Sequence, residues 1–152
     1  MYYSLQSNLI IMKKLYVFAM AVAFVFTAGF SHAQEWNKEQ TEVWKVVQDT
    51  WKGWQTKDVN LVSAAFHDKY QGWSDDSPLP IGKATSIEWF NTMKDAMSIH
   101  FYNIEPARIT VLKTSAVVDY YYSFSYSYIQ GDKTESEEVE GKIAEFYVNE
   151  GG

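Results

Sequence analysis

The sequence predicts an α+β domain in which a cone-shaped, curved antiparallel sheet wraps on three N-terminal helices. Apolar residues recur at helical spacing up to about residue 97, and beyond it they recur at every second position. The order of these two patterns also supports the α+β class, because helices followed by an antiparallel meander are typical of α+β domains. No internal repeat or low-complexity segment interrupts the chain.

The helical part of the pattern divides into three segments. A long amphipathic helix is expected over 35–56, where charged residues separate an apolar stripe of Trp44, Val47, Trp51 and Trp54. Asp58 can cap a short second helix. Ser86 is expected to begin a third helix, which ends at Ser98, and a short strand at 70–74 and a Pro/Gly loop at 75–83 precede it.

The alternating part predicts an antiparallel meander with a bend at Pro106 and a hairpin turn at Gly131 and Asp132. The strands are expected at 99–105, 108–112, 116–130 and 137–148. On the long strand one face carries the aromatic residues Tyr120, Tyr122, Phe124, Tyr126 and Tyr128, and we expect this face to point inward. On the return strand we expect Ala144, Phe146 and Val148 to point inward, which makes Asp119 and Glu145 charges of the surface or of a dimer face.

The first 33 residues have the layout of a secretory signal. From Met12 the chain reads MKKLYVFAMAVAFVFTAGFSHAQ, with two lysines, an apolar run and small residues up to Ala33. The apolar run is shorter than the roughly 20 residues of a membrane span. We therefore expect residues 1–33 to be an N-terminal extension and signal peptide, with Met12 as the true start, and residues 34–152 to be one exported domain, periplasmic or secreted.

Composition excludes several classes of partner and chemistry. After removal of Lys13 and Lys14 with the signal, 11 basic residues face 19 acidic ones, a balance of −8, which disfavours nucleic acid and anionic membrane. Cysteine is absent, so disulfides, thiolate nucleophiles and iron–sulfur clusters are excluded. The histidines lie far apart, and no phosphate-binding loop or dinucleotide fingerprint is present, so we expect neither metal nor cofactor.

Two stretches of the chain are informative, FHDKYQGWSDDSPLPIGKATSIEWF at 66–90 and GKIAEFYVNEGG at 141–152. Both resemble SnoaL-like (DUF4440-like) domains of the nuclear transport factor 2 and ketosteroid isomerase superfamily. The resemblance implies a cone with a mostly apolar pocket, pairing through the outer sheet face, and activities that range from isomerases, cyclases and dehydratases to binding modules. The Trp-containing final strand of the family is missing, so either the reading frame is truncated or the sheet lacks a strand.

Candidate site residues follow from the inward face and from this resemblance. A ligand-binding wall is expected from Trp73, Tyr102, Tyr120, Tyr122 and Phe146. The candidate catalytic groups are His100 or Asp75 as base, with Tyr102 or Tyr120 as hydrogen-bond donor. Each has a structural alternative: tyrosines that fill the core, an edge histidine satisfied by backbone or water, and adjacent acids that form a turn.

These residues are consistent with two alternative functions. The first is a module that binds a small apolar or aromatic molecule in an aromatic-lined cone. The alternative is a cofactor-independent isomerase, cyclase or dehydratase of ketosteroid isomerase type. A homodimer through the outer sheet face is also expected, and a purely structural interface role for that face remains open.

Overall fold

The computed structural model describes residues 35–73 and 77–150, all but the first of which lie in one compact unit, Trp36–Gly152. The expected signal peptide, residues 1–33, lies outside the described residues. In chain order the elements are α2 (Lys38–Thr56), α3 (Val59–Ala64), β1 (Gln71–Gly72), β2 (Ile81–Gly82), α4 (Lys83–Met93), β3 (Met97–Val111), β4 (Ser115–Gln130) and β5 (Lys133–Val148). The predicted α+β class is confirmed.

Helix α2 is the long helix that the sequence predicts, and local chemistry explains its ends. Asn37 caps it: its side chain accepts a hydrogen bond from the Gln40 backbone N–H, and the Gln40 side chain accepts one from the Asn37 backbone. Lys57 closes the helix in a left-handed conformation. The Gln40 amide also donates to the carbonyl of Ile109 at 2.8 Å, which fixes the start of α2 on strand β3.

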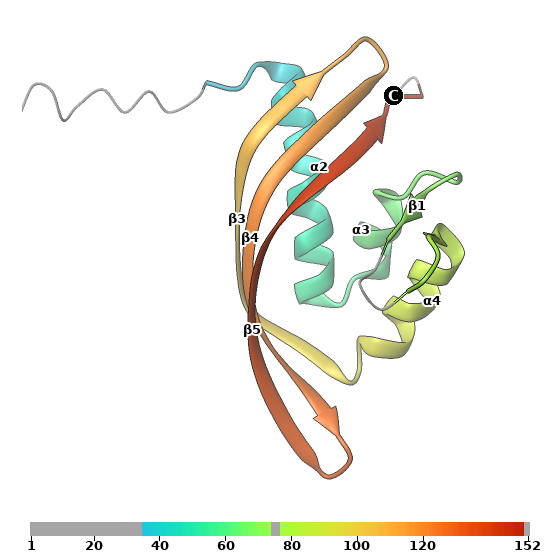
Figure 1. Cartoon of the computed structure of the whole chain (residues 1–152), viewed down its shortest axis with the longest axis vertical. Helices are drawn as coiled ribbons and strands as arrows, with labels where there is room; N and C mark the ends of the chain where they lie inside the picture. The colour runs from blue at the N-terminus through green and yellow to red at the C-terminus, as the bar shows by residue number, and fades with distance from the viewer. Residues whose placement is uncertain (1–34, 74–76, 151–152) are drawn as a thin grey trace, which may run out of the picture. The chain divides into compact units, whose positions relative to one another are not determined.

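Helices α3 and α4 lie on the same side of the sheet as α2 but farther from it (Figure 1). Asp58 caps α3 as predicted, accepting from the backbone of Asn60 and Leu61. A Cβ at Gly53 of α2 would lie 2.8 Å from the Val62 side chain, so glycine is what allows α3 to pack this closely. Helix α4 begins three residues before the expected Ser86, because Gly82 ends the short strand β2 inside the segment expected as a loop.

The main sheet has the order β3-β4-β5 with antiparallel pairing throughout, and β1 and β2 form a separate ribbon. The two strands expected around Pro106 are one strand, β3, with register shifts at Ile99/Phe101 and at Pro106/Arg108. Among the described residues β5 pairs only with β4, so the sheet is unclosed, in agreement with the expected lack of a final strand. No described helix is both long and apolar enough to cross a membrane.

The core lies where α2 packs against the sheet. Val47 of the helix meets Ile109, Val118 and Tyr120 of the sheet, all of them buried. Trp44 contacts the Tyr120 ring edge-on, with centroids 5.7 Å apart. The aromatic face of β4 therefore points inward, as predicted. We call this side, which packs on α2, the inner face of the sheet.

Candidate functional site: a half-buried glutamate among tyrosines

The hairpin register places Glu145 on the inner face. In the β4–β5 pairing Val118 lies opposite Glu145, and the buried Ala116 lies opposite Tyr147. Directly paired residues of neighbouring strands share a face, so Glu145 and Tyr147 point toward the helices with Val118 and Ala116. The expectation that Glu145 faces outward is wrong, whereas Asp119 does face outward, where Arg108 pairs with it at 2.8 Å.

The Glu145 carboxylate is surrounded by tyrosine hydroxyls. Tyr147 donates a hydrogen bond to its Oε2 at 2.5 Å. The Tyr120 hydroxyl also faces Glu145, close enough to lower the pKa of that carboxyl. Burial, and after it the nearby charge of Glu145, raises the pKa of Tyr70, which lies in the chain between α3 and β1.

Burial dominates the acid–base properties of this group. Desolvation raises the pKa of Glu145 above its ordinary value, and the hydrogen bonds from Tyr147 and Tyr120 offset part of this rise. Burial, followed by the negative charge of Glu145, raises the pKa of Tyr120 and Tyr147 as well. The tyrosines therefore stay protonated and serve as donors, while Glu145 can exchange a proton closer to neutral pH than an exposed glutamate can.

Helix α2 positions Tyr120 through Trp51. The Trp51 Nε1–H donates to the Tyr120 hydroxyl oxygen at 3.1 Å, in a site where Tyr120 is 3% exposed. Because that oxygen accepts from Trp51, the Tyr120 proton is free to point toward Glu145 or toward a bound molecule. Around Trp51 three further rings pack with centroids 5.5 to 5.6 Å away, those of Tyr102, Tyr122 and Phe124.

Three of the predicted ligand-binding residues are thus brought together. Tyr102 and Tyr122 pack against Trp51, and Tyr120 connects Trp51 to Glu145. The Tyr122 ring lies over Gly141 of β5, where an added Cβ would come within 2.6 Å of its hydroxyl oxygen. These positions agree with the expected inward face, and a role in ligand binding stays a prediction.

Other predicted site residues lie elsewhere. Phe146 is 68% exposed on the outer face, because its partner across the pairing is the outward-facing Val117. Trp73 is 66% exposed, and its place in a pocket wall stays a prediction. His100 is exposed and contacts Ser127 Oγ at 2.9 Å, since the register shift after Ile99 removes it from the parity of Tyr102. Asp75 lies outside the described residues.

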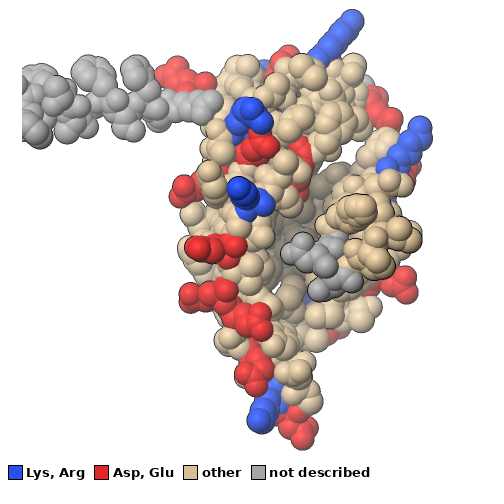
Figure 2. All heavy atoms as spheres, in the orientation of Figure 1, with Lys and Arg blue, Asp and Glu red and all other residues tan. Residues whose placement is uncertain are grey.

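Hollows occur on both sides of the sheet. One of about 350 Å³ lies between α2 and the strand ends, with Val43, Val46, Ala116 and Tyr147 among its walls. Figure 2 shows that the surface is also hollowed between the sheet side and the part of the domain that carries β1. A wider, open hollow of about 520 Å³ lies on the outer face, lined by Asn103, Glu105, Tyr121, Ser123, Glu140 and Lys142 among others.

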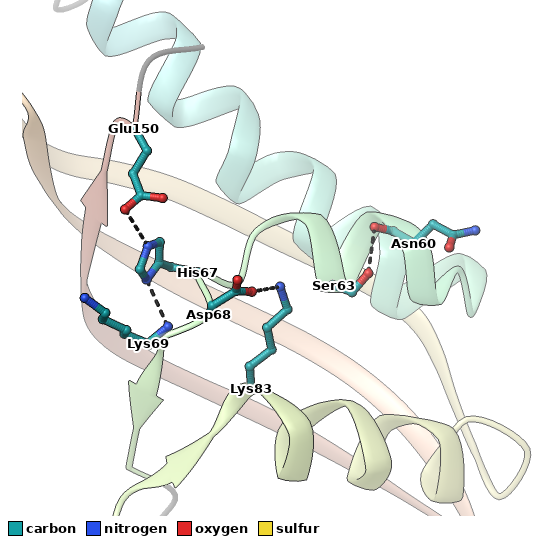
Figure 3. Close-up of polar contacts among 7 residues, drawn as sticks. All are labelled: Asn60, Ser63, His67, Asp68, Lys69, Lys83 and Glu150. Carbon is teal, nitrogen blue, oxygen red and sulfur yellow. Dashed lines mark hydrogen bonds and ion pairs between the residues drawn. The ribbon is translucent and has the colours of Figure 1, made fainter.

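A polar contact links His67 to Glu150. His67, just after α3, approaches the Glu150 carboxylate through Nε2 at 2.9 Å, while its Nδ1 accepts from the Lys69 backbone N–H (Figure 3). The accepting Nδ1 assigns the proton to Nε2, which donates to Glu150. Next to it Lys83 pairs with Asp68 at 3.0 Å, and this cation lowers the pKa of Asp68. The contact between His67 and Glu150 joins the chain just after β5 to the loop after α3.

Within the part of the chain that the structure describes, no group of three or more His, Asp or Glu side chains could hold a metal ion. The expectation that the protein works without metal or cofactor stays an expectation. The chemistry that the described residues offer is proton transfer by Glu145 and hydrogen-bond donation by the tyrosines around it.

Comparisons with known proteins agree on the fold. The most similar solved structures include a conserved protein from Planctomyces limnophilus DSM 3776 (TM-score 0.65, 13% identity, covering 72% of this chain and 83% of that one). A ketosteroid isomerase-like protein from Erwinia carotovora atroseptica SCRI1043 gives a TM-score of 0.58 at 12% identity, covering 72% and 84%. No protein-family profile matches the sequence, and no curated protein does either. The chain therefore shares its fold with these two structures, one of which is ketosteroid isomerase-like, and this agrees with the predicted fold.

Proposed function

We propose that the domain binds a small, largely apolar molecule between the sheet and the helices, and that Glu145 moves a proton on it. The observation that carries the proposal is a carboxyl with a raised pKa within hydrogen-bond reach of a tyrosine hydroxyl, beside the aromatic cluster of Trp51. The reaction class is a cofactor-independent isomerisation, cyclisation or dehydration. The likeness in fold to a ketosteroid isomerase-like protein supports this class.

The chemistry follows from the roles of three residues. The Glu145 carboxylate removes a proton from a carbon next to a carbonyl, and the electron pair moves onto the carbonyl oxygen. Tyr120, whose oxygen already accepts from Trp51, donates its proton in a hydrogen bond to that oxyanion. Glu145 then returns the proton to another carbon, so an isomerisation is balanced without any further reactant.

A proton-transfer assay tests this role. With cyclohex-3-en-1-one as the probe, we expect the domain to catalyse conversion to the conjugated ketone, followed by its ultraviolet absorbance. Glu145→Gln should lower the rate by about 100-fold or more, the usual scale for a general base. Glu138→Gln is the matched control, because Glu138 lies on the same strand but pairs with Ser125 on the outer face. Equal rates for the two variants would exclude Glu145 as the base.

Binding without chemistry is the second candidate function. The ring cluster around Trp51 favours it, since stacked and edge-on aromatic contacts suit an aromatic ligand as well as a substrate. Two results together would favour binding alone over proton transfer. A ligand should raise the melting temperature of both the wild type and Glu145→Gln, and no substrate should be converted.

We also propose that two copies pair through the outer sheet face. Phe101, Tyr121 and Phe146 are exposed there, 58 to 68% each, beside the open outer hollow. Sedimentation should show a dimer that Phe146→Glu dissociates. Leu79→Glu, at an exposed apolar residue outside the sheet, is the control and should leave the dimer intact.

Export remains part of the proposal. In a host that secretes the protein, N-terminal sequencing should find Gln34 as the first residue of the mature chain. A mature protein that still carries residues 1–33 would contradict the signal-peptide interpretation.

A further inference from the structure

The inner face of the sheet extends beyond helix α2. At its far end β4 and β5 continue as a hairpin that projects past the lower end of α2 in Figure 1. The inner face of this hairpin carries Tyr126 and Tyr128 from β4, and Glu135 and Glu137 lie directly opposite them on β5. We call this surface the distal face.

The aromatic cluster of the core continues onto the distal face as a row of rings. Phe124, which touches Trp51, lies 5.4 Å from Tyr126 between ring centroids, and Tyr126 lies 5.8 Å from Tyr128 at an interplanar angle of 28°. Partly buried apolar side chains border these rings on the same face: Met97 and Ile99 from β3 and Val139 from β5. The distal face thus offers apolar contact area next to stacked tyrosines.

A fixed carboxylate lies at the hydroxyl ends of these rings. Tyr126 donates to one oxygen of Glu137 at 2.7 Å, and Tyr128 donates to the other at 3.0 Å. The hydrogen bond to Glu137 is the largest cause that raises the pKa of Tyr126 to about 12, so the tyrosine stays a donor at any physiological pH. The position of the Glu137 charge is therefore set by two rings that also lie beside it.

This negative charge has no cationic partner in the described part of the chain. The ion pairs found there lie on α2, around Asp68 and His67, and at Arg108, and none includes Glu135 or Glu137. Lys133 shares their face, nearer the turn, but pairs with neither carboxylate. Over 132–140 five acidic residues face one lysine, which leaves a net charge of −4.

From these observations we infer that the distal face binds a small organic ammonium compound with an apolar body. The ammonium group would lie over the tyrosine rings, where the ring quadrupole attracts cations, and next to the Glu137 carboxylate, which supplies the opposite charge. The apolar body would cover Ile99, Val139 and the edge of Phe124. This site shares only the edge of Phe124 with the aromatic cluster of Trp51, and it is additional to the proposed proton-transfer function.

Calorimetric titration with 4-phenylbutylamine tests the site, with 4-phenylbutanol as the neutral comparison. We expect the amine to bind at least about fivefold more tightly than the alcohol, and Glu137→Gln to remove most of that preference. Glu138→Gln, which takes the same charge from the opposite face of the same strand, should change the affinity by less than about twofold. Tyr128→Leu should weaken amine binding, because leucine keeps apolar contact area but removes the aromatic ring that attracts the cation.

The outcomes separate this inference from the proposed function. Glu145→Gln should leave amine binding unchanged, so a failed isomerase assay does not affect the result. Equal binding of amine and alcohol would contradict the role of charge. Equal losses in the Glu137 and Glu138 variants would show only nonspecific attraction and would overturn the site, as would the absence of amine binding at millimolar concentration.

Discussion

Trp51 is the residue through which the sheet, helix α2 and the candidate site are connected, and its replacement by phenylalanine should be costly. The indole N–H donates to the Tyr120 hydroxyl at 3.1 Å, and three further rings pack around it within 5.6 Å. Trp51→Phe removes this donor from the hydroxyl of Tyr120, a residue that is only 3% exposed, at a cost of about 1 kcal/mol. The smaller ring also leaves part of the indole volume empty, which adds about 1 to 2 kcal/mol.

The total loss of unfolding free energy is therefore about 2 to 3 kcal/mol, which corresponds to a lower melting temperature by roughly 10 °C in a domain of this size. Urea unfolding at pH 7 measures it, with an unchanged slope against urea concentration as the sign of an unchanged unfolded state. Trp89→Phe is the matched control: Trp89 is 51% exposed and should lose less than about 1 kcal/mol. Equal losses at the two positions would refute the central packing role of Trp51.

Three further predictions test other parts of the structure. Gly141→Ala should cost about 1 to 3 kcal/mol in urea unfolding, because the new Cβ meets the Tyr122 ring, whereas Gly131→Asn should be nearly neutral at a turn residue with φ of 62° and open space around it. Burial raises the pKa of Glu145, so the folded state binds this proton more tightly than the unfolded chain, whose glutamate pKa is about 4.3. The wild type should then lose stability relative to Glu145→Gln as the pH rises from about 4 through the raised pKa, and a constant difference across pH 4–8 would contradict this. Asn37→Ala should destabilise the domain by about 1 kcal/mol by thermal melting, because it removes the capping box of α2, and no change would show that the cap is dispensable.

The fold could be predicted because its signals are local. The tryptophan stripe of α2, the Asp58 cap and the alternation along β4 each act within a few residues, and each is present in the structure. The inward aromatic face of β4 was also predictable, because the other face carries Asp119 and a series of serines. These features needed no knowledge of distant contacts.

The orientation of β5 was predicted wrongly because apolar alternation is ambiguous on a strand whose outer face is also apolar. Ala144 and Phe146 alternate like core residues but lie on the outer side, where Phe146 is exposed. The hairpin turn is a better guide to which face each residue of β5 occupies. A two-residue turn at Gly131 and Asp132 pairs Gln130 with Lys133, and counting back from that pair places Glu145 opposite Val118 on the inner face.

The placement of His100 depended on a feature that residue parity does not reveal. A register shift after Ile99 changes the side to which the following residues point, and Phe101 becomes an outer residue that is 59% exposed. The sequence around His100 contains no glycine or proline that would indicate a bulge. Simple alternation along the strand therefore predicted an inward-facing histidine, which is wrong. A single irregular residue in β3 thus turns His100, one of the two predicted bases, to the outer side of the sheet.

A carbon-13 NMR titration of the Glu145 side-chain carboxyl, in the domain from Gln34 onward, tests the proton-exchanging role of this residue. We expect a pKa above that of an ordinary glutamate, and a further rise in Tyr147→Phe, because this variant removes a hydrogen bond to the ionised form. A pKa at or below the ordinary value, unaffected by loss of the Tyr147 hydroxyl, would contradict a buried, proton-exchanging glutamate at this site.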